Sequence, residues 1–296
     1  MFEPRTQNPA LAAALIVVAT AFIAATTLMA KALGSDAFGP AMNPLQISHG
    51  RYVFAFVVIS IAVGVFRPQF TPVRWRMHAT RTLMGWAGVS LMFASVAFIP
   101  LADATAISFL NPVFGMVLAI PLLKESVGPI RWSAAAIALV GAMILLRPTP
   151  DSFQPAALLA LGAALALGFE LIIIKRLAGR EAPLQILWIN NLLGVGISTV
   201  AVLFVWQAPT LTQWAILAGI GVFMAVAQAC FVNAMARADA SFVAPFSYGT
   251  LIFAAVYDGL FYNVIPDAIT VLGASIIVAG AVLLAFREAQ LQKRKA

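Results

Sequence analysis

Two stretches of this chain, far apart in the sequence, carry the same four letters. Residues 44–47 and residues 183–186 both read Pro-Leu-Gln-Ile, and each stretch opens a long apolar run. A second echo follows, where residues 101–105 read Leu-Ala-Asp-Ala-Thr and residues 237–241 read Arg-Ala-Asp-Ala-Ser. Similarity at a fixed long period is the signature of a duplicated architecture. The sequence therefore predicts two repeats, each about half of the chain.

The repeats are too apolar for a protein that is surrounded by water. The chain is 62% hydrophobic and 10% charged, with a mean hydropathy of +0.97. Soluble domains have roughly 45–50% apolar and about 25% charged residues, so a soluble fold is excluded. The single cysteine, Cys230, excludes an internal disulfide. The net charge of +7 is spread over short loops, so we expect no nucleic-acid partner.

Ten apolar runs are long enough to cross a bilayer as helices, because a spanning helix needs about 20 apolar residues. Their continuous hydrophobicity favours helices, since the strands of a membrane barrel alternate in segments of about ten residues. The first run is too long for the roughly 7–15 apolar residues of a signal peptide, so we interpret it as a span. The runs cover residues 10–31, 45–66, 77–98, 104–123, 130–147, 155–175, 184–206, 213–233, 240–262 and 267–287. We therefore predict an all-α polytopic membrane protein.

The basic residues predict how these spans are oriented. With the N-terminus inside, 15 of the 18 Lys and Arg residues fall in inner segments. Only Lys31 and Arg147 fall outside, and Arg51 lies within a span. Short cytoplasmic loops are enriched in Lys and Arg, so both termini are expected in the cytoplasm.

Residues 1–149 form the first predicted repeat and residues 150–296 the second, with five spans each. Because five is odd, the second repeat begins on the opposite side of the membrane from the first. Inverted repeats of this kind support alternating access, in which exchanging the packing of the two copies moves the opening from one face to the other. The alternative interpretation is a duplicated structural bundle without transport.

Several motifs of the first repeat resemble a known family. They are residues 99–107, residues 111–114, residues 122–125, and Gly141 followed by Arg147-Pro148. With ten spans arranged as five plus five, these motifs resemble the EamA-type members of the drug/metabolite transporter superfamily. The resemblance implies a secondary transporter of small organic metabolites in the bacterial inner membrane, with a cavity between spans one to four and six to nine. Characterised relatives include amino-acid exporters and importers of riboflavin or S-adenosylmethionine.

Arg51 is the sharpest candidate for substrate binding, because a central Arg costs roughly 2.5–3.5 kcal/mol on insertion scales. It either binds a substrate carboxylate or pairs with Asp258, which is expected at a similar depth. His49 is a candidate proton-coupling group, since its unperturbed pKa is about 6.5. Its alternative role is that of a polar residue near the outer interface.

Glu170 is the main carboxylate inside a span. It either binds a substrate ammonium or relays protons, or it forms a structural ion pair. The candidate partners for that pair are Lys175, Arg176 or a basic residue of another helix. Arg51 and Glu170 together suit a zwitterion, although their positions in the spans place them near opposite faces.

Polar and aromatic side chains supply further candidates for the cavity. In lipid, polar side chains must be satisfied within the protein, so they either line a cavity or join helices. Aromatic rings near the midplane can stack on a substrate. The polar candidates are Asn111, Asn190 with its neighbour Asn191, and Gln228; the aromatic candidates are Trp86, Trp188 and Tyr248.

No catalytic motif is present in the sequence. It holds no HExxH, Cys/His cluster or phosphate-binding loop, so we expect no enzyme, no metal and no cofactor. The expected partners are a small-molecule substrate, the lipid bilayer and, as a candidate coupling ion, protons. We interpret the chain as an amino-acid exporter. The alternatives are an importer of riboflavin or S-adenosylmethionine and, in another class, a membrane scaffold or an intramembrane enzyme.

Overall fold

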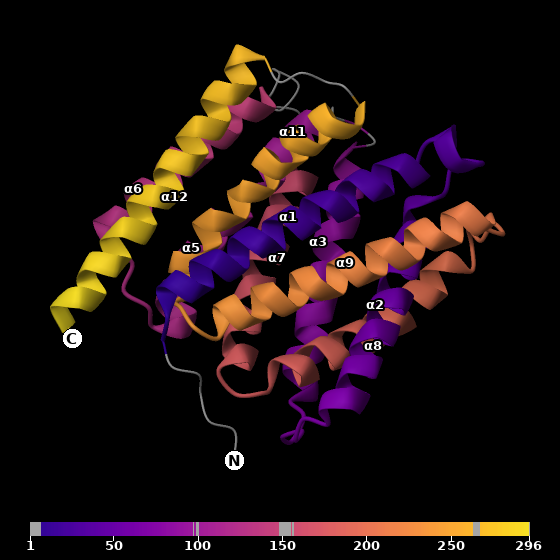
Figure 1. Cartoon of the computed structure of the whole chain (residues 1–296), viewed down its shortest axis with the longest axis horizontal. Helices are drawn as coiled ribbons and strands as arrows, with labels where there is room; N and C mark the ends of the chain where they lie inside the picture. The colour runs from indigo at the N-terminus through magenta and orange to yellow at the C-terminus, as the bar shows by residue number, and fades with distance from the viewer. Residues whose placement is uncertain are drawn as a thin grey trace.

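The computed structural model describes residues 7–96, 98, 101–147, 155, 157–262 and 267–295. Helices make up nearly all of these residues and pack into one bundle (Figure 1). The prediction of an all-α polytopic membrane protein is confirmed. Part of the motif at 99–107, Pro148 and the predicted boundary between residues 149 and 150 lie outside the described residues.

Helix starts follow local capping rules. Asn8 accepts a hydrogen bond from the Leu11 backbone N–H at 3.0 Å, and a proline stands in the first turn. The helices of the first half are α1 (Pro9–Leu33), α2 (Pro44–Phe66), α3 (Trp75–Val96), α4 (Leu101–Ser108), α5 (Asn111–Leu123) and α6 (Pro129–Leu146), with a short 3₁₀ turn, η1 (Asp36–Phe38), before α2.

The second half repeats this order of elements. Thr210 caps the longest of its first three helices through a capping box with Gln213. The elements are α7 (Ala157–Ala178), α8 (Pro183–Val202), α9 (Leu211–Met235), α10 (Ala240–Val243), η3 (Ala244–Tyr248), α11 (Gly249–Tyr262) and α12 (Ala268–Lys295).

Two of the predicted spans are not continuous α-helices. The run 104–123 is interrupted between α4 and α5, and the run 240–262 contains the 3₁₀ segment η3. Pro112 and Pro245 follow closely on the starts of α5 and η3, and proline removes a backbone N–H from the helical ladder. The expectation of single helices was wrong in this detail. Discontinuous helices at corresponding places of two halves are a feature of transporter sites.

One helix is less apolar than the others. In the part of the chain that the structure describes, nine helices are long and apolar enough to cross a membrane, and α3 is not among them. The cause is its polar first half, which contains Arg76, His78, Arg81 and Thr82. Such side chains inside a bundle mark a site rather than a lipid-facing surface.

Helices of the two halves pack against each other in pairs (Figure 1). α1 lies along α9, α3 along α7, α2 along α8, and α6 along α12 at the side of the bundle. In the last pair the backbones approach closely, since a Cβ at Gly141 would lie 2.7 Å from the Gly273 carbonyl oxygen. Ala134, Ala138 and Ala142, spaced by four residues, are buried there, and small residues of this kind allow helices to pack closely.

We call the end that holds residues 67–74 and the turn 179–182 the inner end, and the opposite one the outer end. The predicted orientation places the inner end in the cytoplasm.

Candidate functional site

An ion pair lies inside the bundle between α3 and α7. The Arg81 Nε and Glu170 Oε1 atoms are 3.7 Å apart, and the two side chains are 3% and 21% exposed. Room for the carboxylate is made by Gly85 on α3, because a Cβ there would lie 2.9 Å from Glu170 Oε2. The glycine therefore allows Glu170 to lie directly against α3, and about a fifth of the Glu170 side chain stays exposed.

Arg51 reaches the same cluster from α2. Its guanidinium lies 4.0 Å from the centroid of the Tyr52 ring, a cation–π distance. The Arg51 charge lies within electrostatic reach of Glu170. The ring itself fits against α8 at Gly194, where a Cβ would lie 2.3 Å from it. The cluster therefore draws on four helices: α2, α3, α7 and α8.

The expected pair between Arg51 and Asp258 does not form. Asp258 instead lies 2.9 Å from Lys31, which joins α11 to α1 at the outer end. Across the described ranges, Arg51 makes no hydrogen bond and no ion pair within 4 Å of a carboxylate oxygen. This one of the two alternatives for Arg51 is wrong, because depth in the membrane does not determine which helices are neighbours.

The partner of Glu170 lies on another helix, which was one of the alternatives. Lys175 donates to the Met235 carbonyl at 2.9 Å, and Arg176 donates to the Leu122 carbonyl at 2.6 Å. The two residues are therefore used for joining helix ends. Arg51 and Glu170 lie within electrostatic reach of each other, although the sequence suggested positions near opposite faces.

The polar amides join helices around the cluster. The Thr82 hydroxyl donates to Asn190 Oδ1 at 3.2 Å, connecting α3 to α8. Asn191 Nδ2 donates to Gln228 Oε1 at 2.9 Å, connecting α8 to α9. Asn191 Oδ1 is buried without a hydrogen-bond partner. Asn190 thus lies beside Arg81 and its ion pair, whereas Gln228 lies one contact further away.

Three other candidates connect neighbouring helices through hydrogen bonds. The His49 Nδ1 and Ser198 Oγ atoms are 3.1 Å apart, which joins α2 to α8. Trp188 Nε1 donates to Ser60 Oγ at 3.0 Å. Asn111 spans the interruption between α4 and α5, because its Nδ2 donates to the Ser108 carbonyl at 2.9 Å.

The two remaining aromatic candidates differ in exposure. Trp86, on α3, keeps 37% of its surface exposed. Tyr248 has none, and its hydroxyl donates to the Phe109 carbonyl at 2.8 Å. In this conformation Tyr248 lies in the packed core, stacked on the Phe109 ring with centroids 5.7 Å apart.

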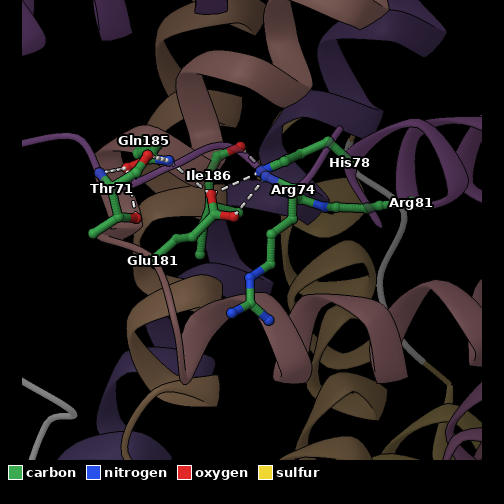
Figure 2. A network of polar contacts seen from close by, with 7 residues as sticks. All are labelled: Thr71, Arg74, His78, Arg81, Glu181, Gln185 and Ile186. Atoms are coloured by element: carbon green, nitrogen blue, oxygen red, sulfur yellow. Dashed lines mark hydrogen bonds and ion pairs between the residues drawn. The ribbon is translucent and has the colours of Figure 1, made fainter. Parts of the chain in front are cut away.

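A second polar network lies at the inner end, in the interface of α3 with α8 (Figure 2). His78 Nε2 and Glu181 Oε2 are 2.8 Å apart, and both side chains are almost completely buried. Glu181 also accepts hydrogen bonds from Gln185 Nε2 at 2.9 Å and from the Arg74 backbone N–H at 3.3 Å. The carboxylate therefore holds the start of α3 against the start of α8.

Sequence reasoning missed Arg81, His78 and Glu181 as candidates. Arg81 was counted with the basic residues of the inner loop, although it is the seventh residue of α3. The signal that could have found it is a charge inside a helix whose predicted run begins at residue 77. Among the described residues, no group of three or more His, Cys, Asp or Glu side chains is arranged to hold a metal ion.

The sequence matches the EamA-like transporter family twice, over residues 10–147 and over residues 154–286. The chain belongs to the EamA-like transporter family. It is therefore a multi-pass membrane transporter, not an enzyme.

Similar proteins carry the names of metabolite transporters. A riboflavin transporter of Vibrio cholerae is 30% identical over 83% of this chain and 84% of its own length. An S-adenosylmethionine uptake transporter of Rickettsia bellii is 26% identical over 92% of each chain. A riboflavin transporter of Rhizobium johnstonii is 34% identical over 75% of this chain and 74% of its own length. This chain is thus a secondary transporter of small metabolites.

The fold is also found in a solved structure. A crystal structure of a protein with 17% sequence identity aligns with a TM-score of 0.78, covering 95% of this chain and 98% of that chain. At this identity the likeness shows the fold alone, which is the EamA double-repeat arrangement of helices.

Proposed function

We propose that this chain takes up a water-soluble heterocyclic metabolite, of the riboflavin or S-adenosylmethionine kind, across the bacterial inner membrane by alternating access. This replaces amino-acid export as the preferred function. The similar proteins named above support it, because two are riboflavin transporters and one is an S-adenosylmethionine uptake transporter. Riboflavin is the first compound to test, and S-adenosylmethionine is the second.

The proposed site rests on the observation that the Arg51 guanidinium has no hydrogen-bond acceptor in the described part of the protein. A guanidinium has five N–H donors and stays charged, and a charge inside the bilayer is costly. Arg51 has the Tyr52 ring beside it and, in the described part of the protein, no acceptor for these donors. A carbonyl or carboxylate oxygen of the substrate supplies that acceptor.

The surrounding groups fit a substrate with a flat ring and several polar atoms. Arg81 and Glu170 provide a donor and an acceptor beside Arg51, and Asn190 adds an amide. Trp188 belongs to an aromatic group with Phe56, whose ring centroid lies 5.6 Å away. Aromatic faces of this kind stack on heterocycles. His49, Trp86, Asn111, Gln228 and Tyr248 remain proposed members of the wider cavity.

S-adenosylmethionine is kept as a second candidate because of Glu170. A substrate with both a carboxylate and an amine can place the first on Arg51 and the second on Glu170, whose side chain is 21% exposed. The same argument applies to amino acids, whereas riboflavin needs no anion in the site. Glu170→Gln therefore separates the candidates, since it weakens binding of an amine-bearing substrate more than binding of riboflavin.

The test is binding to the purified protein, measured as the rise in its thermal midpoint with riboflavin, S-adenosylmethionine and a panel of amino acids. A ligand of the folded state stabilises by mass action, about 2.7 kcal/mol at a hundredfold excess over Kd. We expect riboflavin to raise the midpoint of the wild type and to lose this effect in Arg51→Lys, which loses the bidentate fork. The matched control is Arg147→Lys, at the outer end of α6, which is expected to keep the effect. No shift with any of these compounds would contradict the proposed substrates.

A further inference from the structure

The repeated Pro-Leu-Gln-Ile motif places a glutamine at the third position of α2 and of α8. Gln46 in α2 is buried, and its side-chain amide pairs with the backbone of a single residue, Gln207. Its Nε2 donates to the Gln207 carbonyl at 2.5 Å, and its Oε1 accepts from the Gln207 N–H at 3.1 Å. The pair joins the outer start of α2 to the connector that follows α8.

Gln185 in α8 makes the same two-point pair at the inner end. Its Oε1 accepts from the Thr71 N–H at 2.8 Å, and its Nε2 donates to the Thr71 carbonyl at 2.9 Å. Thr71 lies five residues after the end of α2, and Gln207 lies five residues after the end of α8. The two contacts therefore correspond to each other: in each, a glutamine of one half binds the backbone of a connector in the other half.

Each pair fixes where the next helix begins. Thr71 lies four residues before α3, and Gln207 lies four residues before α9. Gln185 thereby holds the start of α3 against the start of α8 at the inner end. Gln46 holds the start of α9 against the start of α2 at the outer end. One residue type, duplicated with the repeat, thus holds corresponding helix pairs at opposite ends of the molecule.

We propose that Gln46 and Gln185 are the latches of two gates: an outer gate between α2 and α9, and an inner gate between α3 and α8. The proposal rests on the alternating access proposed above. Releasing Gln185 from Thr71 frees the start of α3 and opens the inner gate. Releasing Gln46 from Gln207 frees the start of α9 and opens the outer gate.

The outer gate is closed by direct helix packing. A Cβ at Gly50 would lie 2.7 Å from Leu217 Cδ2, and a Cβ at Gly221 would lie 2.3 Å from Phe54 Cβ. Backbones this close leave no space for solvent between α2 and α9. Opening this gate requires the separation of a dry, interlocked surface.

The inner gate is closed through polar side chains. Beside the Gln185 latch it is held by the pair of His78 with Glu181, and Arg81 approaches the Ile186 carbonyl at 3.4 Å (Figure 2). His78 Nδ1 is buried without a hydrogen-bond partner, and Arg81 Nε has the Glu170 carboxylate only at the ion-pair distance of 3.7 Å. Buried polar atoms without partners destabilise the closed arrangement, and water can satisfy them once the gate opens. The inner gate is therefore the one that opens from this conformation.

The latches are tested by the accessibility of single cysteines in a Cys230→Ala background. Thr82→Cys reports on the inner gate and Leu217→Cys on the outer gate; both positions are buried. Each reporter is combined with Gln185→Leu or with Gln46→Leu. Labelling by a membrane-impermeant thiol reagent is followed in inside-out and in right-side-out vesicles.

We expect Gln185→Leu to speed labelling of the Thr82→Cys reporter from the cytoplasmic side by about tenfold, because the two hydrogen bonds with the Thr71 backbone and the one to Glu181 are lost. Labelling of the Leu217→Cys reporter from outside should not rise. Gln46→Leu should give the reverse pattern. Equal changes at both ends, or no change at either, would overturn the assignment of the latches.

A second measurement does not depend on how well the leucine variants fold. Cysteine pairs at 71 with 185, and at 46 with 207, are joined by a short bifunctional thiol reagent that forms reducible bonds. Joining either pair should stop net transport, and reduction should restore it. Full cross-linking with unchanged transport would refute the gates. Labelling needs no substrate, so the latches can fail while riboflavin still binds, and the proposed substrate can fail while the labelling pattern holds.

Discussion

The interface of α2 with α9 and the interface of α3 with α8 occupy corresponding positions, yet their chemistry differs. The fourth and seventh residues of α9 are Trp214 and Leu217, whereas those of α3 are His78 and Arg81. Both interfaces keep the same glutamine latch. The two interfaces therefore share the glutamine contact of the repeat, and they differ in that His78 and Arg81 stand where α9 has Trp214 and Leu217.

This difference supports the proposed site, which lies on the side of the bundle that holds the polar interface of α3. The ion pair of Arg81 with Glu170 continues from the polar interface of α3 into the bundle. The corresponding part of α9 packs against α2 through glycines. Buried charged side chains therefore lie along α3, whereas the first half of α9 contributes one buried polar side chain, Gln213, which donates to the Pro40 carbonyl at 2.8 Å.

The largest expected effect comes from removing the carboxylate of the inner interface. Glu181→Ala leaves His78, Gln185 and the Arg74 N–H without their acceptor. Breaking a buried pair by removing one partner costs about 3–5 kcal/mol. We therefore expect a clear fall of the thermal midpoint of purified protein. The control, Glu181→Gln, keeps an oxygen acceptor and should lose much less; equal losses would show that the hydrogen bonds of Glu181 do not hold this interface.

The second largest effect is expected at the closely packed interface of α2 with α9. Gly221→Ala places a Cβ 2.3 Å from Phe54 Cβ and 2.8 Å from the Ala55 N atom, so backbone has to move. Overpacking of this kind typically costs about 1–3 kcal/mol. The matched control is Gly196→Ala in α8, where a Cβ meets nothing within 4 Å. A thermal midpoint that is the same for both variants would mean that α2 and α9 are not closely packed.

The variant Gly85→Ala, beside the ion pair of Arg81 with Glu170, is expected to lose less stability and more transport. Gly85→Ala meets only the far end of the Glu170 side chain, which can rotate away. Its thermal midpoint should stay close to that of the wild type. Because Glu170 then leaves Arg81, initial rates of uptake into vesicles should fall and KM should rise. Unchanged uptake would separate the ion pair from the transport site.

The smallest effect is expected outside both interfaces. Arg147 donates to Asp267 between the ends of α6 and α12, and this hydrogen bond lowers the pKa of Asp267. A lowered pKa in the folded state stabilises at neutral pH, and this contribution is lost as the pH falls below about 4, the unperturbed value. Both side chains are about half exposed, so Asp267→Asn should change the midpoint slightly at pH 7. The difference from the wild type should vanish in acid, and a difference that grows there would contradict this sign.

The spans, and the repeated motif that contains the two glutamines, can be recognised from the sequence because they depend on local pattern. Each of the ten apolar runs corresponds to one or two helices of the structure, nine of them long and apolar enough to cross a membrane among the described residues, and the repeated motif contains Gln46 and Gln185. The charge pairs could not be predicted from the sequence. Arg81 and Glu170 are 89 residues apart, and Asp258 had both Lys31 and Arg51 at plausible depth. Which helices become neighbours depends on packing of the whole bundle, and that information is not local.

The central claim is that the substrate binds where the polar interface of α3 meets the cluster of Arg51, Arg81 and Glu170. The most direct measurement is the rate at which the Thr82→Cys reporter is labelled from the cytoplasmic side, with and without saturating riboflavin. Thr82 follows Arg81 and contacts Asn190, so a bound substrate shields it. The account predicts that riboflavin slows labelling in proportion to its occupancy and leaves the Leu217→Cys reporter unaffected. If riboflavin raises the thermal midpoint but leaves labelling of the Thr82→Cys reporter unchanged, the substrate binds elsewhere and the claim is wrong.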